Sequence, residues 1–564
     1  MRQPPPRRGS SRSDVMSRAS CFFSAGFHRS KVRECVCSSL RSGADTTRVC
    51  ARTHTVTCES AILFTRRMMS MAADDSQHAA PSQAQLRLNG FILLLASSLF
   101  QDVIEDYGET DGEYDHEPIV TLLVMVALLS ARFALPVVCS YALCVISWKG
   151  SRFPGTSNHA NLQLFIHASL LVAATPHSLH TQRAAYDSIL RASSSTCEGA
   201  LAIAYIWAGW HKMNYDFFST RHGCALNFIN RWSRRLLKLP PIGTVDADGP
   251  LWPLIMAAGL GAILLECGAG VLQLQSGAGA RSLGVACALM LHVPLSLISF
   301  FDFSSVALAV FYLSSRPVVL QPFTVRDWSC PVDRRAAIHV LGLSTASCLV
   351  RPLLSVLAPN RRQEAKEVEL CLGVAFLLGA TYLALPSLSG GGVIRGFRWP
   401  RRVWQWSMLL SVVLFGASPY LGLSTAGCFT MFSNIATQGE SSNHLLLGQN
   451  PFKMFRFQDD IVTVVSISPR LDGSWGLLPH RGQRFPRVLF SQWLDEVVSV
   501  RAHEEPWFHL VVRHGAQEHD LSYGAGPWRE PFLRVRTRDA WWPTNWLSFR
   551  ESDVVYGVGQ RCSQ

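Results

Sequence analysis

Long runs of apolar residues, separated by short polar segments, make up most of the chain between residues 89 and 423. A helix that crosses a membrane needs about 20 consecutive, mostly apolar residues. The candidate runs are 89–104, 119–148, 162–174, 200–210, 252–274, 283–313, 336–358, 370–388 and 406–423. Depending on how the short and long runs are divided, this pattern predicts eight to eleven membrane helices.

Several of these runs contain polar or ionisable side chains, namely His167, Glu266, His292 and Asp302. An ionised group in the middle of a bilayer costs about 3 kcal/mol or more, so helices facing lipid on all sides would not carry it. A bundle with a polar interior tolerates such groups. The pattern therefore predicts an all-α, polytopic membrane bundle, in which each polar group either locks two helices together or serves the function.

The pattern changes after residue 424. Short β-leaning runs such as DDIVTVVSIS, PWFHLVVRHG and EPFLRVRTRD are separated there by Pro, Gly and clusters of charge. We therefore expect a transmembrane helical domain over 85–424 and a small α+β extramembrane domain over 425–564.

The composition supports an integral, multi-pass membrane protein, without indicating which membrane. Apolar residues make up 48% of the chain and charged residues only 16%, against about 25% charged residues in soluble domains. The net charge is +12, but thirteen basic and four acidic residues lie in 1–70, so the remainder carries only +3. We therefore exclude nucleic acid as a partner. Residues 1–84 are expected to form a disordered basic leader or a transit-like segment, and Met68, Met69 and Met71 would also allow an over-extended start.

The sixteen cysteines do not follow a metal-binding pattern. Cys35 and Cys37 are too close for the usual two-residue separation, and no pair of histidines accompanies them. The sequence therefore predicts no metal site.

The stretch YIWAGWHKMNYDFF, residues 205–218, carries the strongest candidate site. On a continuous helix Lys212 and Asp216 would lie four residues apart on one face and pair, with His211 and Asn214 nearby. One interpretation is that the helix ends at the membrane surface, where Lys212 reaches the lipid phosphates. In the other interpretation Lys212 points inward, and burial favours a neutral amine that takes a proton. This second hypothesis requires that no permanent counter-ion neutralises the amine.

Further candidate residues lie elsewhere in the chain. His292, in ALMLHVPLSL, needs a hydrogen-bond partner in a dry environment, and Lys212 is a candidate to face it. Asn434, Asn443 and His444 follow the last apolar run. They either cap a loop between the two domains, because Asn side chains mimic backbone turns, or close over a membrane cavity and line it.

Several segments resemble the horizontally transferred transmembrane (HTTM) domain family, which is related to vitamin K-dependent gamma-glutamyl carboxylase. The stretch YIWAGWHKMNYDFF is similar to an aromatic–Ala-Gly-x-x-Lys-x-Asn/Asp segment of that family. YLGLSTAGCFTMFSNIATQGESSNHLLL at 420–447 and FRFQDDIVTVV at 455–465 are also similar, as are FPRVLFSQWLDE, VVRHG and WLSFRESDVV near the end. The likeness covers roughly residues 85–555.

This resemblance implies a chemistry for Lys212. In the carboxylase a lysine of this segment is the base that deprotonates reduced vitamin K, and carbon dioxide is then added to glutamate. The matching position makes Lys212 the expected catalytic base and a reduced vitamin K-like quinone the expected cofactor. The large luminal domain that binds the carboxylase's substrate is not apparent in this sequence.

Two alternatives to an enzyme remain open. The polar groups Lys212, Glu266, His292 and Asp302 would line a cavity for a lipid or an ion in a protein that binds or transports it. In an assembly factor, the C-terminal domain would instead contact a protein partner. Membrane lipid is an expected partner under each of these hypotheses.

Overall fold

The structure is a computed structural model. It describes parts of 88–95 and 142–146, most of 157–314 and 396–467, parts of 482–521, and residue 547. All described residues belong to one compact unit, Met69–Gln564. The predicted leader at 1–84, the predicted helices at 336–358 and 370–388 and most of the run at 119–148 lie outside the described residues.

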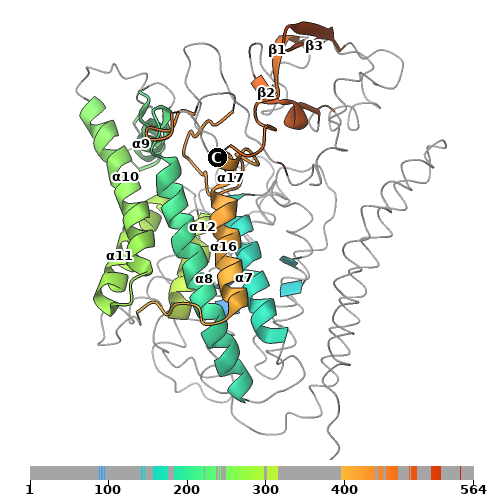
Figure 1. Ribbon diagram of the computed structural model, residues 1–564. Helices are drawn as coiled ribbons and strands as arrows, with labels where there is room; N and C mark the ends of the chain where they lie inside the picture. Colours follow the sequence, from blue (N-terminus) through green and yellow to red (C-terminus); the bar gives the residue numbers. More distant parts are fainter. Residues whose placement is uncertain are drawn as a thin grey trace, which may run out of the picture. The chain divides into compact units, whose positions relative to one another are not determined.

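The helices pack around α8, which runs from Arg183 to His211. In Figure 1, α8 lies beside α7 (Asn158–Ala174), α10 (Trp252–Gln273) and α16 (Val403–Gly416), and it also contacts α12 (Phe301–Ser314). Further helical elements are α9 (Cys224–Leu236), α11 (Ala278–Leu297), α17 (Ser418–Leu421) and the short 3-10 helix η2 (Asp216–Phe218).

A small antiparallel sheet follows the helices, with strand order β2-β1-β3-β4. Its strands are β1 (Ile461–Ile467), β2 (Arg484–Pro486), β3 (Leu510–His514) and β4 (Gln517–Asp520). The register of β1 against β3 shifts between Val464 and Ser466, which marks a bulge. The prediction of a mostly helical chain with a small sheet in its C-terminal part is therefore confirmed.

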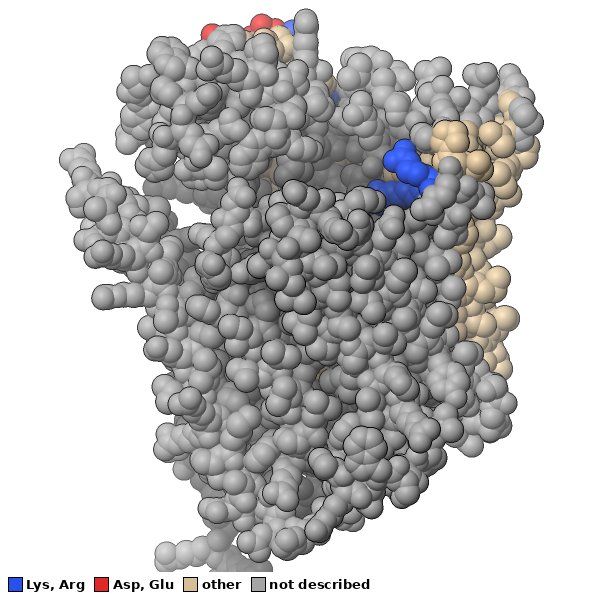
Figure 2. Space-filling view, turned by 180° about the vertical axis from the view of Figure 1, so that it is seen from behind, with Lys and Arg blue, Asp and Glu red and all other residues tan. Residues whose placement is uncertain are grey.

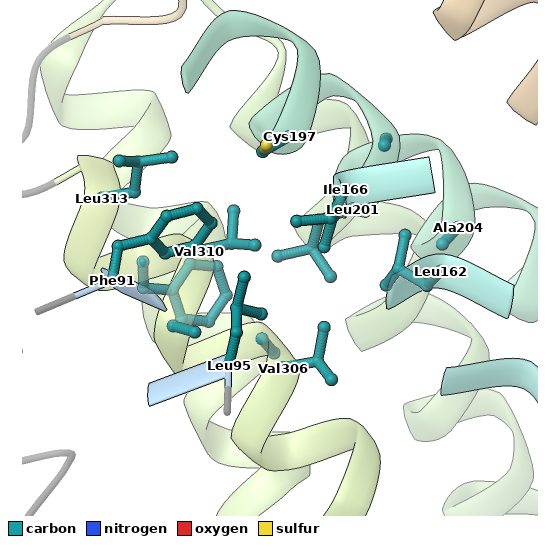
Figure 3. Packing of buried hydrophobic residues seen from close by; sticks show 14 of the residues in the cluster. Phe91, Leu95, Leu162, Ile166, Cys197, Leu201, Ala204, Val306, Val310 and Leu313 are labelled. Carbon is teal, nitrogen blue, oxygen red and sulfur yellow. The ribbon is translucent and has the colours of Figure 1, made fainter. Parts of the chain in front are cut away.

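The main hydrophobic core lies between helices that are far apart in the sequence. Figure 3 shows Phe91 and Leu95 meeting Ile166 of α7, Leu201 of α8 and Val306 of α12. These side chains are buried, and such burial contributes about 25 cal/mol for each Å² of apolar surface removed from water.

Two glycines allow α8 and α10 to approach closely. A Cβ atom at Gly209 would lie 2.5 Å from Cys267 Sγ, and one at Gly270 would lie 2.6 Å from the backbone oxygen of Ala202. Real Cβ atoms do not come this close to other heavy atoms, so neither position accommodates a larger residue without a shift. The close contact determines which side chains of the two helices face each other.

Among the described residues, one helix is long and apolar enough to cross a membrane, namely α10. Shorter apolar helices cover Phe303–Leu313 and Val403–Gly416. The single run predicted at 283–313 forms two helices, α11 and α12, and Pro294 lies inside the first. The multi-pass bundle as a whole stays a prediction.

Candidate functional site

Lys212 is buried at the end of α8, immediately after the last helical residue. Its side chain is 3% exposed, so it does not reach a lipid or water surface in this structure. The Nζ atom donates hydrogen bonds to the backbone oxygens of Ala208, at 3.3 Å, and Met431, at 3.2 Å. An ammonium group has three donors, and Glu266 takes the third.

Glu266 of α10 is the counter-ion of Lys212. The Lys212 Nζ atom lies 3.0 Å from Oε1 and 2.7 Å from Oε2 of this carboxylate, which is 4% exposed. Gly209 and Gly270, each about one turn away, permit the helix contact that brings the two charges together. A buried ion pair of this kind is strongly destabilised when one partner is removed, because the other charge is left uncompensated.

The sequence identified Glu266 only as an isolated polar group in an apolar run. It is the one charged residue of α10, and Lys212 directly follows the apolar C-terminal part of α8. Two opposite charges in apolar helices are a signal for pairing, but the sequence does not define which helices pack together. The expected partner was Asp216, on the same segment.

Asp216 does not pair with Lys212 in the structure. The helix ends at His211, so the spacing of four residues no longer places the two side chains on one helical face. Asp216 lies in η2 and accepts a hydrogen bond of 2.8 Å from Asn443 Nδ2.

Asn214 connects the end of α8 to the segment around Ser433. Its Nδ2 donates to the backbone oxygens of His211, at 2.7 Å, and of Ser433. Its Oδ1 accepts from the backbone N–H of Phe217 at 2.8 Å. The backbone of Asn214 also forms an isolated antiparallel bridge with His444.

Asn434 and Asn443 hold the second side of this junction. Asn434 has a φ of +51°, a left-handed conformation that Asn tolerates better than most residues, and its Oδ1 accepts from the backbone N–H of Cys224 at 2.9 Å. Asn443 Nδ2 donates to the backbone oxygen of Asn434 at 2.7 Å, and its Oδ1 accepts from Ala436 N–H at 2.8 Å. Both asparagines therefore act as backbone mimics at a junction.

His444 is held as a neutral imidazole. The backbone N–H of Leu446 donates to Nδ1 at 3.2 Å, so Nδ1 must be the acceptor, and the proton on Nε2 is donated to the backbone oxygen of Trp210 at 3.1 Å. Burial lowers the pKa of His444 from its ordinary value, against the opposing effect of the Trp210 carbonyl. The His444 and Trp210 rings lie 4.9 Å apart.

His211 joins an aromatic cluster beside Lys212. Its ring contacts those of Trp207, at 5.4 Å, and Tyr420, at 5.5 Å, which also lie 6.1 Å from each other, and its Nδ1 lies 3.1 Å from the Tyr420 hydroxyl. Tyr420 also meets the edge of His444. We call these residues and Trp210 the aromatic cluster. The sequence did not identify Tyr420 as part of the site, because its place depends on how α17 packs.

His292 belongs to α11 and contacts α8 at a different level from Lys212. It hydrogen bonds to the hydroxyl of Tyr205 and, at 2.9 Å, to Ser304 Oγ. Tyr205 precedes Lys212 by seven residues, which corresponds to about 10 Å along a helix. The structure thus gathers seven of the predicted site residues around the end of α8 and places His292 about two turns away, between α8, α11 and α12. The seven are His211, Lys212, Asn214, Asp216, Asn434, Asn443 and His444.

No family model, curated protein or solved structure matches the chain. The resemblance to the HTTM family therefore stays a prediction, and the function is argued from the site itself.

Proposed function

We propose that this chain is a multi-pass membrane protein of the HTTM and gamma-carboxylase-like class, in which Lys212 and Glu266 together accept a proton from a quinone-type cofactor. One observation carries the proposal. A lysine that directly follows the apolar end of α8 and a glutamate of the apolar helix α10 are buried together, with their charged atoms 2.7 Å apart. Ionisable groups inside membrane bundles are costly and are found mainly where function requires them.

The outward faces of the helices support a lipid environment. Apolar side chains of α10 are exposed at Leu254, Leu260 and Leu264, the last at 71%. Figure 2 shows uncharged residues on the flank where α10 lies, with a small group of Lys and Arg beside its upper part. A helix that is apolar on its exposed and its buried faces is typical of a membrane span.

Glu266 changes how the amine would act as a base. The sequence-based hypothesis required an amine without a permanent counter-ion, whereas Lys212 has both a counter-ion and two carbonyl acceptors. The amine is therefore occupied at rest. It becomes a base when one proton moves from Lys212 to Glu266, which converts the ion pair into a neutral amine and a neutral carboxylic acid. In this proposal Glu266 holds that proton while Lys212 takes another.

The types of residue near Lys212 are suited to binding an aromatic cofactor. A reduced quinone would supply an ionisable hydroxyl group. The rings of Trp207, His211 and Tyr420 contact one another at the end of α8, which Lys212 directly follows, and aromatic rings of this kind stack favourably on another ring. These residues would orient the ring and exclude water, while Lys212 and Glu266 would handle the proton.

A substitution of Lys212 by Arg tests the proposal. The guanidinium group keeps the positive charge beside Glu266 but stays protonated, so it cannot act as a base. With reduced vitamin K, molecular oxygen, a glutamate-containing peptide and labelled bicarbonate, we expect the wild-type protein to carboxylate the peptide and form the epoxide, and the Lys212→Arg protein to lose at least about 100-fold in rate. A wild-type protein that does neither would contradict the carboxylase chemistry.

A matched control is available in a second buried ion pair. Arg281 of α11 and Glu198 of α8 lie 2.6 Å apart and are similarly buried. Arg281→Lys replaces an arginine by a lysine, the reverse of Lys212→Arg, and it changes no residue of the proposed site. We expect it to retain most of the activity. An equal loss in both variants would show that any disturbed ion pair abolishes activity.

The alternative function is non-enzymatic, with the chain binding or transporting a lipid or ion, or acting as an assembly factor. One observation favours it: all three donors of the Lys212 ammonium group have acceptors, as in a purely structural lock. This alternative predicts that Lys212→Arg leaves function largely unchanged.

A further inference from the structure

Exposed tryptophan and arginine side chains gather just before and at the start of α16. Arg398, Trp399, Arg401, Arg402 and Trp406 are all exposed, and we call them the Trp–Arg surface. The two tryptophans are 52% and 48% exposed, and their rings stack at 5.8 Å with an angle of 14° between the planes. Two neighbouring tryptophans that are each about half exposed are unusual on a surface that faces only water.

The backbone of this surface is firmly held. Gln405 Oε1 accepts from the backbone N–H groups of Arg401 and Arg402, each at 2.9 Å. The Nε2 of the same side chain donates to Ala192 O at 2.8 Å and to Ser195 Oγ at 3.0 Å, both on α8. The exposed side chains are therefore presented from a fixed platform.

The Trp–Arg surface continues into an exposed apolar face of α16. Val403, Leu410 and Leu414, spaced by about two turns and one turn, are 83%, 56% and 51% exposed. The opposite face, with Leu409 and Val412, is buried against the bundle. Cations and tryptophans at one end, followed by apolar side chains along the helix, match the order of chemistry across one leaflet of a membrane.

The location of the Trp–Arg surface beside the C-terminal end of α10 agrees with this order. The backbone N–H of Phe397 donates to Gln275 O at 2.9 Å, just beyond the C-terminal end of α10. The 22 residues of α10 extend about 33 Å, against a hydrocarbon thickness of about 30 Å. If α10 spans the membrane, the Trp–Arg surface lies at the depth of one layer of headgroups.

We propose that the Trp–Arg surface binds the headgroups of anionic phospholipids, whose acyl chains lie along the exposed face of α16. Three arginines within five positions provide positive charge, and guanidinium groups match phosphate oxygens in geometry. Trp399 and Trp406 contact the region between headgroup and acyl chain. The proposal rests on the membrane placement given above, but it does not depend on proton transfer at Lys212.

Fluorescence quenching by brominated lipids tests this proposal on the full-length protein. The protein is reconstituted in phosphatidylcholine vesicles that contain a small fraction of either dibrominated phosphatidylglycerol or dibrominated phosphatidylcholine. Subtraction of the Trp399→Phe/Trp406→Phe signal isolates the quenching at the Trp–Arg surface from that of the other tryptophans. At low salt we expect phosphatidylglycerol to quench this signal at a concentration at least about threefold lower than phosphatidylcholine.

Charge removal identifies the cause of the preference. In the Arg398→Gln/Arg401→Gln/Arg402→Gln protein, we expect both brominated lipids to quench the fluorescence equally. A control protein with Arg456→Gln and Arg513→Gln, two exposed arginines outside this surface, keeps the threefold preference.

Three results would overturn the proposal. They are a lack of quenching at Trp399 and Trp406 by either lipid, equal quenching by the two lipids in the wild type, and a preference that survives removal of the three arginines. Carbonate extraction of the same vesicles distinguishes a failure of the membrane placement from a failure of the headgroup site. Extraction of the protein contradicts the membrane placement, whereas retention without a lipid preference contradicts the headgroup site alone.

Discussion

At the scale of single residues, Lys212 and Glu266 determine both the stability and the chemistry of the site. Each is buried, and each provides the main compensation for the other's charge. The position of Glu266 within an apolar run and that of Lys212 just after one could be read from the sequence, but their pairing could not. Asp216 was the nearer candidate in the chain, and it was displaced because the helix ends before the spacing of four residues is completed.

Removal of one charge of the pair tests its contribution to stability. We expect Glu266→Gln to lower the free energy of unfolding by about 3–5 kcal/mol, because the Lys212 ammonium group stays buried without a carboxylate. Thermal unfolding in detergent measures the loss. The Lys212→Met/Glu266→Leu protein, which has neither charge, should recover most of the stability and remain inactive. An unchanged melting temperature for Glu266→Gln would argue against a buried pair.

His444 makes a pH-dependent contribution at the same junction. The native state favours the neutral ring and lowers its pKa, so the unfolded state binds the proton more readily. Stability is therefore full above the unfolded pKa of about 6.5 and falls as the pH drops below it. We expect the wild-type melting temperature to decrease more between pH 7.5 and 5.5 than that of His444→Asn. Equal decreases would contradict the assigned neutral ring.

At the scale of elements, the apolar runs located α7, α10, α12 and α16, because the length and composition of a run are visible in the sequence. The end of α8, the division of 283–313 and the pairing of helices depend on tertiary contacts. Glycine positions carry part of that information, since the contact of α8 with α10 depends on small residues at the interface.

A comparison of two glycines in α10 tests the helix contact. Gly270→Ala places a Cβ atom 2.6 Å from Ala202 O, whereas the same atom at Gly268 meets nothing within 4 Å. We expect Gly270→Ala to cost about 1–3 kcal/mol and to reduce activity by moving Glu266 away from Lys212. Gly268→Ala should lower neither stability nor activity, because Ala is at least as favourable as Gly inside a helix. Unfolding and activity assays on the two proteins measure the difference, and equal behaviour would contradict the close contact.

At the scale of the whole molecule, the described segment after residue 424 divides into two parts. The described residues of 430–438 and 442–446 hold the end of α8, and Gln458 bonds to Thr437 at 2.7 Å and to Pro419 O at 3.2 Å. The sheet begins only at Ile461. The change of pattern at 424 therefore marks the end of the apolar helices, and the described residues between 424 and 460 belong with the site.

Two truncated chains test this division. A chain that ends at Asp460 should insert into membranes and keep the Lys212 site, whereas a chain that ends at Ser424 should lose the acceptor at Met431 and the contacts of Asn443. We expect the shorter chain to melt at a clearly lower temperature and to be inactive. Loss of a protein partner from the longer chain would assign partner binding to the sheet. Equal stability of the two chains would contradict the division.

The most direct test of the central claim is the exchange of the Lys212 Nζ protons with water, measured by NMR on protein labelled with ¹⁵N-lysine. The chain has only six lysines, so the spectrum is simple: Lys31, Lys149, Lys212, Lys238, Lys366 and Lys453. The signal missing in Lys212→Arg identifies Lys212. We predict that this signal exchanges slowly and shifts in Glu266→Gln. Exchange as fast as that of a solvent-exposed lysine, with no response to Glu266→Gln, would contradict a buried, paired amine.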